Sequence, residues 1–391
     1  MNKVILRKKE ENRVLAGHLW VFSNEIDHVE GEIANGDLVE VFSSRKQFIG
    51  IGLANKNSLI AVRILTRDRE EIDKEFFKKR ISAAYSFRQE MYPKERSYRL
   101  VYGESDFLPG LVIDKYEDFL VLQVMSLGLE LKLDLIADAL TDIFRPRGIY
   151  LRNDAEVRTL EGMELYKKEF RGSAPPNYLG IEQSGISYKV DVVNGQKTGF
   201  FFDQRDNREA LKTYAKNKAV LDCFCYNGGF SLSAARGGST RVTGVDSSQE
   251  AVKQSMDNAQ INDLQDECEF IESDVFDFLT NQVLKGKSYD VVNVDPPSFT
   301  KTKKNLPQAI KGYRKLNSLA MQAVKRGGIL VSSSCSHYMD EYTFINMLKD
   351  SALRAKRTLR LVEFRGQAKD HPVLMAMPET QYLKCAIMEV G

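Results

Sequence analysis

Two short segments in the second half of the chain carry groups that can act on a nucleotide base. The first is Asp295-Pro-Pro-Ser-Phe299, and the second is Ser334-Cys-Ser-His337. Two prolines after Asp295 remove two N–H donors, which leaves backbone carbonyls and the carboxylate as hydrogen-bond acceptors. Acceptors suit a base that presents an amino group and a protonatable ring nitrogen, such as cytosine or adenine. In the second segment, a thiolate at Cys335 can serve as a nucleophile.

Both segments also have a purely structural interpretation. Consecutive prolines make a rigid exit from a strand, and a cysteine is most often a small buried hydrophobic residue. We expect that packing role for the other four cysteines, Cys223, Cys225, Cys268 and Cys385. Cys335 differs from them because hydroxyl groups and His337 surround it, and His337 either activates the thiol or only fills space. We therefore take Cys335 and Asp295 as the catalytic candidates.

A third segment, Val220–Phe230, has the pattern of a ligand-binding loop. Its apolar run ends at Asp222, and two glycines, Gly228 and Gly229, follow. A buried strand that breaks at its carboxyl end into such a loop and a helix makes a ligand crevice in an open α/β sheet. The loop is neither the G-x-G-x-x-G fingerprint nor a phosphate-binding loop. An acid at its mouth repels a pyrophosphate but suits a cationic or hydroxylated ligand, which favours S-adenosylmethionine (SAM) over NAD or ATP.

Further acidic residues follow the next two predicted strands. An acid after the second strand can accept both hydroxyls of an adenosine ribose. An acid after the third can accept from the adenine amino group, while an apolar neighbour flanks the ring. One such aspartate is weak support, because aspartate is common in turns. The predicted cofactor residues of the loop and of these strand ends are Asp222, Phe224, Asn227, Gly228, Asp246, Ser247, Asp274, Val275 and Asp295.

From about residue 186, short apolar runs alternate with helical patterns. The predicted strands are Val220–Cys223, Arg241–Val245, Glu269–Ile271, Val291–Val294 and Ile329–Ser332. The predicted helices are Gln249–Asn262, Asp277–Lys285 and Ile310–Lys325. Such alternation predicts an α/β fold with a mainly parallel sheet. Two last strands, Leu359–Arg365 and Tyr382–Glu389, are expected to close it as an antiparallel hairpin, as in a Rossmann-like class I methyltransferase domain.

The residues before this domain predict two smaller parts. Short runs in residues 1–70 predict the strands of a small β-barrel or sandwich, Lys3–Leu6, Leu38–Phe42, Phe48–Ala54 and Leu59–Leu65. Here Trp20 and Phe22 either stack on bases or pack in the core, and we favour the core. Residues 71–185 begin with an amphipathic helix, Glu71–Tyr92, and continue as an α+β domain. The predicted domains are thus 1–70, 71–185 and 186–391.

Composition excludes several classes of protein. Among the 391 residues no apolar run is long enough to span a bilayer, and no signal-peptide pattern is present. The five cysteines form no C-x-x-C pair, which predicts neither a metal site nor disulfides and fits a cytoplasmic protein. A net charge of +2 indicates no partner by itself. A basic stretch without acids could contact phosphates: Lys301, Lys303, Lys304, Lys311, Arg314, Lys315, Lys325 and Arg326.

The set of motifs resembles that of the RlmI-like ribosomal RNA cytosine-5 methyltransferases, over essentially the whole chain. The resemblance rests on the two segments above, the loop after Asp222, Phe200-Phe-Phe-Asp-Gln-Arg205 and Asp370-His-Pro-Val373. The run Arg13–Glu25 is also similar to the opening of PUA domains, which are small RNA-binding barrels. The resemblance implies a PUA barrel, a middle domain and a catalytic domain that binds SAM, with Phe202, Gln204 and Arg205 beside the cofactor and Cys335 as nucleophile.

The implied reaction forms 5-methylcytosine in 23S ribosomal RNA. We expect the Cys335 thiolate to add to carbon 6 of cytosine while Asp295 hydrogen-bonds the ring. Many such enzymes have Pro-Cys after the strand-four aspartate, whereas this chain has Pro296-Pro297, as in enzymes that methylate an exocyclic amine. Methylation of an adenine or guanine amine therefore stays open, as does an RNA-binding assembly factor that transfers no methyl group. The oligomeric state, including a homodimer, also stays open.

Overall fold

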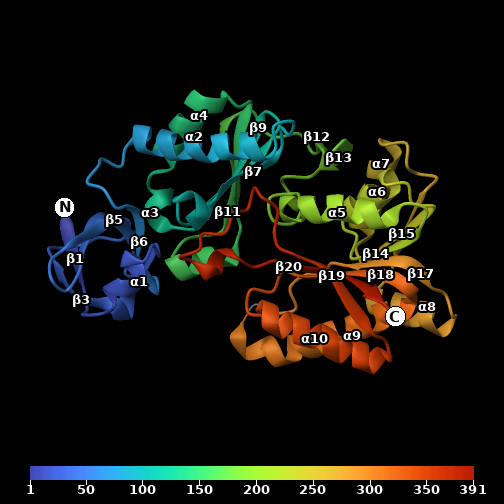
Figure 1. The fold of residues 1–391 in the computed structure, drawn as a ribbon. Coiled ribbons are helices and arrows are strands. Elements are labelled where there is room, and N and C mark those ends of the chain that lie inside the picture. Colours follow the sequence, from blue (N-terminus) through green and yellow to red (C-terminus); the bar gives the residue numbers. More distant parts are fainter. Residues whose placement is uncertain (301) are drawn as a thin grey trace. The chain divides into compact units, whose positions relative to one another are not determined.

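The computed structural model describes residues 1–300 and 302–391, which fold into two compact units (Figure 1). Unit 1 comprises Met1–Ile181, Val190–Phe202 and Lys369–Thr380, and unit 2 comprises Glu182–Lys189, Asp203–Ala368 and Gln381–Gly391. The chain therefore passes between the units several times. The predicted domain boundaries at residues 70 and 185 remain predictions. No helix among the described residues is both long and apolar enough to cross a membrane.

Unit 1 begins with a six-stranded sheet in the order β2-β6-β5-β4-β1-β3. Its elements are β1 Asn2–Leu6, α1 Glu11–Leu15, β2 Trp20–Phe22, β3 Ile26–Glu30, β4 Leu38–Phe42, β5 Phe48–Ala54 and β6 Ile60–Thr66. Four strands coincide with predicted strands within one residue at each end. The other two, β2 and β3, escape prediction because β2 has three residues and β3 is mostly exposed, so neither shows a clear apolar alternation.

The aromatic side chains of β2 are engaged inside unit 1. The indole Nε1 of Trp20 donates a hydrogen bond to Glu104 Oε1 over 2.9 Å. The Trp20 ring lies edge-on to Phe22 with 6.3 Å between ring centroids, and the Arg13 guanidinium lies 4.8 Å from the Phe22 centroid. Both aromatic residues are only partly exposed. These contacts are those of packing residues, as favoured above.

The second sheet of unit 1 has the order β11-β10-β9-β8-β7. Its strands are β7 Tyr98–Tyr102, β8 Leu111–Tyr116, β9 Phe119–Val124, β10 Gly148–Asn153 and β11 Tyr166–Gly172, and its helices are α2 Lys74–Met91, α3 Leu127–Glu130 and α4 Leu133–Phe144. One buried cluster contains Ile51 and Leu65 of the first sheet together with Phe77 of α2 and Ile136 of α4. The first and second sheets therefore share a continuous apolar core.

Unit 2 is built on a seven-stranded sheet in the order β16-β15-β14-β17-β18-β20-β19. The strands are β14 Ala219–Cys223, β15 Arg241–Asp246, β16 Cys268–Glu272, β17 Tyr289–Val294, β18 Val324–Ser334, β19 Leu359–Arg365 and β20 Lys384–Val390. All pairs are parallel except those of β20 with β18 and β19. The prediction of a mainly parallel sheet with an antiparallel closing hairpin is confirmed. The strand order reverses between β14 and β17, where ligands bind in open α/β sheets.

Helices cover both faces of this sheet (Figure 1). One group lies on one face, α5 Arg205–Ala215, α6 Gly229–Arg236 and α7 Gln249–Gln260, and the other group on the opposite face, α8 Val275–Leu284, α9 Leu306–Ala323 and α10 Glu341–Ala355. Side chains of Ser248, Asp274 and Asp340 cap α7, α8 and α10 by accepting backbone N–H groups. A separate two-stranded sheet pairs β12 Leu179–Gln183 with β13 Ile186–Val190.

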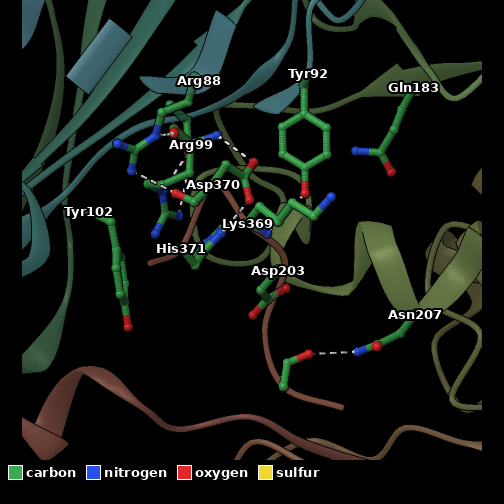
Figure 2. Close-up of polar contacts among 12 residues, drawn as sticks. Arg88, Tyr92, Arg99, Tyr102, Gln183, Asp203, Asn207, Lys369, Asp370 and His371 are labelled. Atoms are coloured by element: carbon green, nitrogen blue, oxygen red, sulfur yellow. Dashed lines mark hydrogen bonds and ion pairs between the residues drawn. The ribbon is translucent and has the colours of Figure 1, made fainter. Parts of the chain in front are cut away.

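The segment Lys369–Thr380 follows β19 in sequence but belongs to unit 1. Figure 2 shows Arg88 and Arg99 beside Asp370 in this segment. Arg88 Nη2 donates to the Asp370 carbonyl over 2.7 Å, and the Arg99 backbone N–H donates to Asp370 Oδ2 over 3.1 Å. Asp370 Oδ1 lies 2.7 Å from His371 Nδ1. Asp370 and His371, which begin the Asp370-His-Pro-Val373 motif, are thus buried and anchor this segment inside unit 1.

Candidate functional site

Asp222 ends β14 and is held by two side-chain donors. Ser231 Oγ of α6 donates to Oδ2 over 2.7 Å, and Asn293 Nδ2 of β17 donates to Oδ1 over 2.8 Å. Burial raises the pKa of Asp222 to about 6, although the two donors and the nearby Arg208 favour the ionised form. The carboxylate therefore joins two strands and a helix at the point where the strand order reverses.

The loop that follows Asp222 has an uncommon backbone conformation. Phe224, Tyr226 and Gly228 all have positive φ angles, of 65°, 49° and 84°, and only glycine adopts such angles at little cost. Asn227 between them is 1% exposed, and its Nδ2 has no hydrogen-bond partner among the described residues. A buried donor that the protein leaves unused is suited to a ligand acceptor.

Asp246 ends β15 beside this loop. The backbone N–H groups of Tyr226 and Ser248 donate to its two carboxylate oxygens, each over 3.0 Å. Each oxygen keeps a further lone pair, so the carboxylate can still accept from two ribose hydroxyls. Its neighbour Ser247 is exposed. The loop donor and this strand-end acid together fit the polar groups of SAM.

Asp274 and Val275 lie after β16, the edge strand next to β15. Asp274 is exposed and caps α8 by accepting the Asp277 N–H over 3.0 Å. Val275 is buried in the core cluster with Leu279. Because β14, β15 and β16 are parallel neighbours in register, the ends bearing Asp222, Asp246 and Asp274 share one edge of the sheet. Capping and packing account for Asp274 and Val275, so their contact with adenine remains a prediction.

Asp295 follows β17, on the other side of β14. Gln204 Nε2 donates to Asp295 Oδ1 over 2.9 Å, and Asn207 Nδ2 donates to Gln204 Oε1 over 2.6 Å. Burial, followed by the charge of Asp203, raises the pKa of Asp295 to about 7, against the opposing effects of Arg208 and Gln204. Near neutral pH this carboxyl group can therefore donate a proton as well as accept one.

Cys335 directly follows β18, the neighbour of β17, and is partly exposed. Its Sγ lies 4.0 Å from the Pro296 carbonyl oxygen. The hydroxyl of Ser336 lies 3.0 Å from that of Ser298 and 2.9 Å from that of Tyr313. The two segments predicted to carry the chemistry are therefore in direct contact, with the sulfur beside the residue that follows Asp295.

The segment before α5 divides between the two units. Phe202 belongs to unit 1, where its ring centroid lies 5.2 Å from those of Phe200 and Tyr116. Gln204 and Arg205 belong to unit 2, and both are buried. Of these three predicted cofactor residues, Gln204 lies at Asp295. The role of all three toward the cofactor remains a prediction.

Lys384, which the sequence analysis does not single out, lies beside the Cys335 segment. It is 3% exposed, and its Nζ donates to the carbonyls of Ser336 and Tyr382 over 2.8 and 2.7 Å. A lysine between apolar residues at the start of a strand, in Tyr382-Leu-Lys-Cys-Ala386, is the signal that could have revealed it. His337, by contrast, is exposed and lies edge-on to the ring of Tyr338.

The basic stretch is not one surface. Lys303 and Lys304 are exposed just before α9, whereas Lys325 and Arg326 follow its other end. An 18-residue helix is about 27 Å long, so these two pairs of cations lie far apart, and their contact with phosphates remains a prediction. Two of the cations are paired, Lys325 with Asp290 at 2.8 Å and Arg314 with Asp350 at 2.6 Å. Lys301 lies outside the described residues.

Two family models match the sequence. Residues 4–67 match the model of a PUA-like domain, and residues 167–375 match that of an S-adenosylmethionine-dependent methyltransferase. The chain is 41% identical over 386 residues to ribosomal RNA large subunit methyltransferase I of Photobacterium profundum, covering 97% of each chain. It is 39% identical over 393 residues to the protein of the same name from Escherichia coli O9:H4, covering 99% of each.

Solved structures share the fold over nearly the whole length. A candidate methyltransferase crystallised with SAH has a TM-score of 0.86 at 22% identity, with 99% of this chain and 100% of the other covered. A candidate SAM-dependent methyltransferase from Streptococcus mutans has a TM-score of 0.84 at 23% identity with the same coverage. The expected fold, an α/β methyltransferase domain preceded by a PUA-like domain, is confirmed.

Proposed function

Because the chain belongs to the ribosomal RNA large subunit methyltransferase I family, we propose that it forms 5-methylcytosine in 23S ribosomal RNA through a covalent adduct with Cys335. The chain is a SAM-dependent methyltransferase. One observation supports the choice of target atom above all. The Cys335 Sγ lies 4.0 Å from the Pro296 carbonyl, so a nucleophilic sulfur and the Asp295 segment border the same small region of unit 2.

The need for a thiol follows from the chemistry of cytosine. Carbon 5 is a poor nucleophile until a group adds at carbon 6. In the proposed reaction the Cys335 thiolate forms a bond to carbon 6, and the electron pair of the 5,6 double bond becomes available at carbon 5. Bound SAM supplies the methyl group for that carbon. A base then removes the carbon-5 proton, the double bond re-forms, and the sulfur leaves as thiolate.

Asp295 is suited to stabilise the adduct. When sulfur adds at carbon 6, negative charge develops on ring nitrogen 3 of cytosine. A carboxyl group whose pKa is about 7 is partly protonated at neutral pH and can donate a hydrogen bond to that nitrogen. When ionised, it accepts from the amino group. Gln204 occupies one of its oxygens and so orients the other.

The target cytosine must lie in a single-stranded segment or leave its stack to reach this region. We propose that the PUA-like domain contributes RNA contacts and that the protein acts where ribosomal RNA is made, in the cytoplasm. Exposed Lys303 and Lys304, next to the Asp295 segment, are suited to bind phosphates.

Replacement of Cys335 by alanine tests the proposal. We expect methyl transfer from radiolabelled SAM to ribosomal RNA that lacks the modification to fall below detection, because the other four cysteines are buried and cannot replace the thiol. Cys268→Ala, in edge strand β16, is the matched control and should transfer at the wild-type rate. Digestion of the RNA and mass spectrometry of its nucleosides should identify 5-methylcytidine as the wild-type product.

The two rival functions give other results in the same experiment. Pro296-Pro297 favours an exocyclic-amine methyltransferase, which needs no thiol. In that case Cys335→Ala would keep its turnover, and the product would be an N-methylated adenosine or guanosine. An assembly factor that only binds RNA would label no RNA, whichever residue stands at position 335. Either result would contradict the cytosine-5 proposal.

A further inference from the structure

A buried ammonium group lies next to the catalytic segment. Lys384 starts β20 and pairs with Ser334, the last residue of β18, across the sheet. Its Nζ then reaches past Cys335 to the carbonyl of Ser336, over 2.8 Å. The side chain thus lies against the backbone on both sides of Cys335. With 3% of its surface exposed, it is among the few buried lysines or arginines of the described chain.

Lys384 has no acidic partner among the described residues, whereas three buried arginines of unit 1 have one. Arg88 is paired with Asp106, Arg99 with Asp114, and Arg63 with Glu161, all in unit 1. Among the described residues, both hydrogen-bond partners of Lys384 are backbone carbonyls, and no carboxylate lies within ion-pair distance. A buried charge without a counterion is costly. Such a group indicates that a negative charge is present nearby in the working state.

The groups around Lys384 indicate that this negative charge is on Cys335. Cys335, Asp340 and Glu341 are the groups that favour its ammonium form, and of the three the influence of Cys335 is largest. Burial acts more strongly in the other direction and lowers the Lys384 pKa to about 8, so the side chain remains mainly charged at pH 7. Asp340 is committed to capping α10. Glu341 is exposed and its Oε1 accepts a hydrogen bond from Gln381 Nε2 over 2.8 Å. The Pro296 carbonyl and the Tyr313 and Ser298 hydroxyls at the Cys335 segment are neutral.

We propose that Lys384 is a positioning residue that holds Cys335 as the thiolate, through the ammonium charge fixed at the Ser336 carbonyl. The inference rests on the proposed function, in which Cys335 must be ionised to attack carbon 6. A positive charge beside a thiol stabilises the thiolate, which is the reactive form. His337 cannot substitute from its exposed position beside Tyr338, where solvent screens its charge.

The test measures the reactivity of the thiol without RNA or SAM. The other four cysteines are buried, so the rate of alkylation by iodoacetamide reports Cys335, and Cys335→Ser gives the background. The rate is followed from pH 5 to pH 10. In the wild type we expect it to reach half of its maximum below about 8.5, the value for an ordinary thiol. A wild-type midpoint at or above 8.5 would overturn the proposal, and this outcome needs no variant.

Three substitutions separate charge from packing. Lys384→Gln keeps a donor for the Ser336 carbonyl but loses the charge, and we expect alkylation at pH 7 to slow about tenfold, the effect of one pKa unit on the thiolate fraction. Lys384→Met should have at least this effect. Lys384→Arg keeps the charge and should recover most of the rate. If Lys384 only fixed the backbone, folded Lys384→Gln would alkylate at the wild-type rate, and the inference would be wrong.

The two proposals can fail separately. Turnover that survives in Cys335→Ala contradicts the cytosine-5 mechanism but leaves the alkylation result intact. Unchanged alkylation in Lys384→Gln contradicts the role of Lys384, even if Cys335→Ala is inactive. Circular dichroism and thermal melting of each variant establish that the compared proteins are folded.

Discussion

The carboxylates on the two sides of β14 are treated differently by the protein. On the β15 side, the oxygens of Asp246 accept two backbone N–H groups, and Asp222 at the end of β14 accepts two side-chain donors. On the β17 side, Asp295 has one donor, Gln204, among the described residues. Burial raises the pKa of both carboxyl groups, to about 6 for Asp222 and to about 7 for Asp295, where the charge of Asp203 acts in the same direction.

The comparison distinguishes the carboxyl groups with a structural role from the one with a chemical role at this edge of the sheet. The donors that Asp222 and Asp246 accept from the protein fix both carboxyl groups beside the cofactor loop. An acid with few donors, close to Asp203 and to the Cys335 segment, can change its protonation during a reaction. Such a site lowers the free energy of unfolding, because a buried polar group with few hydrogen-bond partners destabilises the folded state. The predictions below test this contrast.

The largest effect is expected for Asp295→Ala. Loss of the group that stabilises the adduct should lower the single-turnover rate of methyl transfer by about 10²- to 10⁴-fold. SAM affinity, measured by calorimetry, should change far less, because Asp222 and Asp246 are untouched. The proposed difference between the β15 side and the β17 side of β14 would be wrong if Asp295→Ala abolished SAM binding and left the rate at saturating SAM unchanged.

A smaller effect is expected in the pH dependence of stability for Asp295→Asn. The pKa of Asp295 is about 7 in the folded chain and about 3.9 when unfolded, so folding favours the protonated form. This stabilisation is fully present below pH 3.9 and is lost as the pH rises toward 7. Asparagine has no such dependence. The free energy of unfolding of the variant relative to wild type should therefore rise between pH 4 and 7 and then level off, as measured by urea denaturation.

That measurement has a clear opposite outcome. If the difference between Asp295→Asn and wild type stayed constant from pH 4 to pH 8, Asp295 would titrate like an exposed carboxylate. It would then resemble a fixed charge, and the distinction between the two sides of β14 would be lost.

The smallest effect is expected for Gly228→Ala. Its φ of 84° lies in the left-handed region, and an added Cβ would stand 3.3 Å from the Cβ of Ser255. We expect a loss of about 1–2 kcal/mol in the free energy of unfolding and weaker SAM binding. Gly180→Ala, where nothing lies within 4 Å of the added atom, is the control and should change little. Equal effects of Gly228→Ala and Gly180→Ala would show that the backbone conformation of the loop after Asp222 is not specifically required.

Most of unit 2 could be predicted because parallel strands flanked by helices leave a strong periodic pattern. The ends of the predicted strands Val220–Cys223 and Val291–Val294 agree with those of β14 and β17. Strand β14 ends before Phe224, which has a positive φ of 65°, and β17 ends before Asp295-Pro296. Strand β20 begins two residues later than predicted, because the strand pairing starts at Lys384 and not at Tyr382. Asp295 could be predicted because it lies in a recognisable motif. Its hydrogen-bond partner Gln204 could not, because it lies 91 residues away in the sequence.

The sequence marks Lys384 only as a lysine among apolar residues and does not show what it lies next to. Its importance depends on antiparallel pairing between β20 and β18, which joins residues 50 positions apart, Ser334 and Lys384. The sequence also does not predict that Lys369–Thr380 returns to unit 1, because this depends on long-range hydrogen bonds from Arg88 and Arg99 to Asp370. Sequence patterns identify the reactive groups, whereas long-range pairing determines which of them are neighbours.

The position of β20 in the sheet has a consequence for biosynthesis. The strand is synthesised after every other strand of the sheet, yet it stands between β18 and β19. Until it emerges, both neighbours present open backbone edges, and Lys384 is absent from the catalytic segment. The complete sheet, and with it the contact between Lys384 and the Ser336 carbonyl, can therefore form only after β20 has been synthesised.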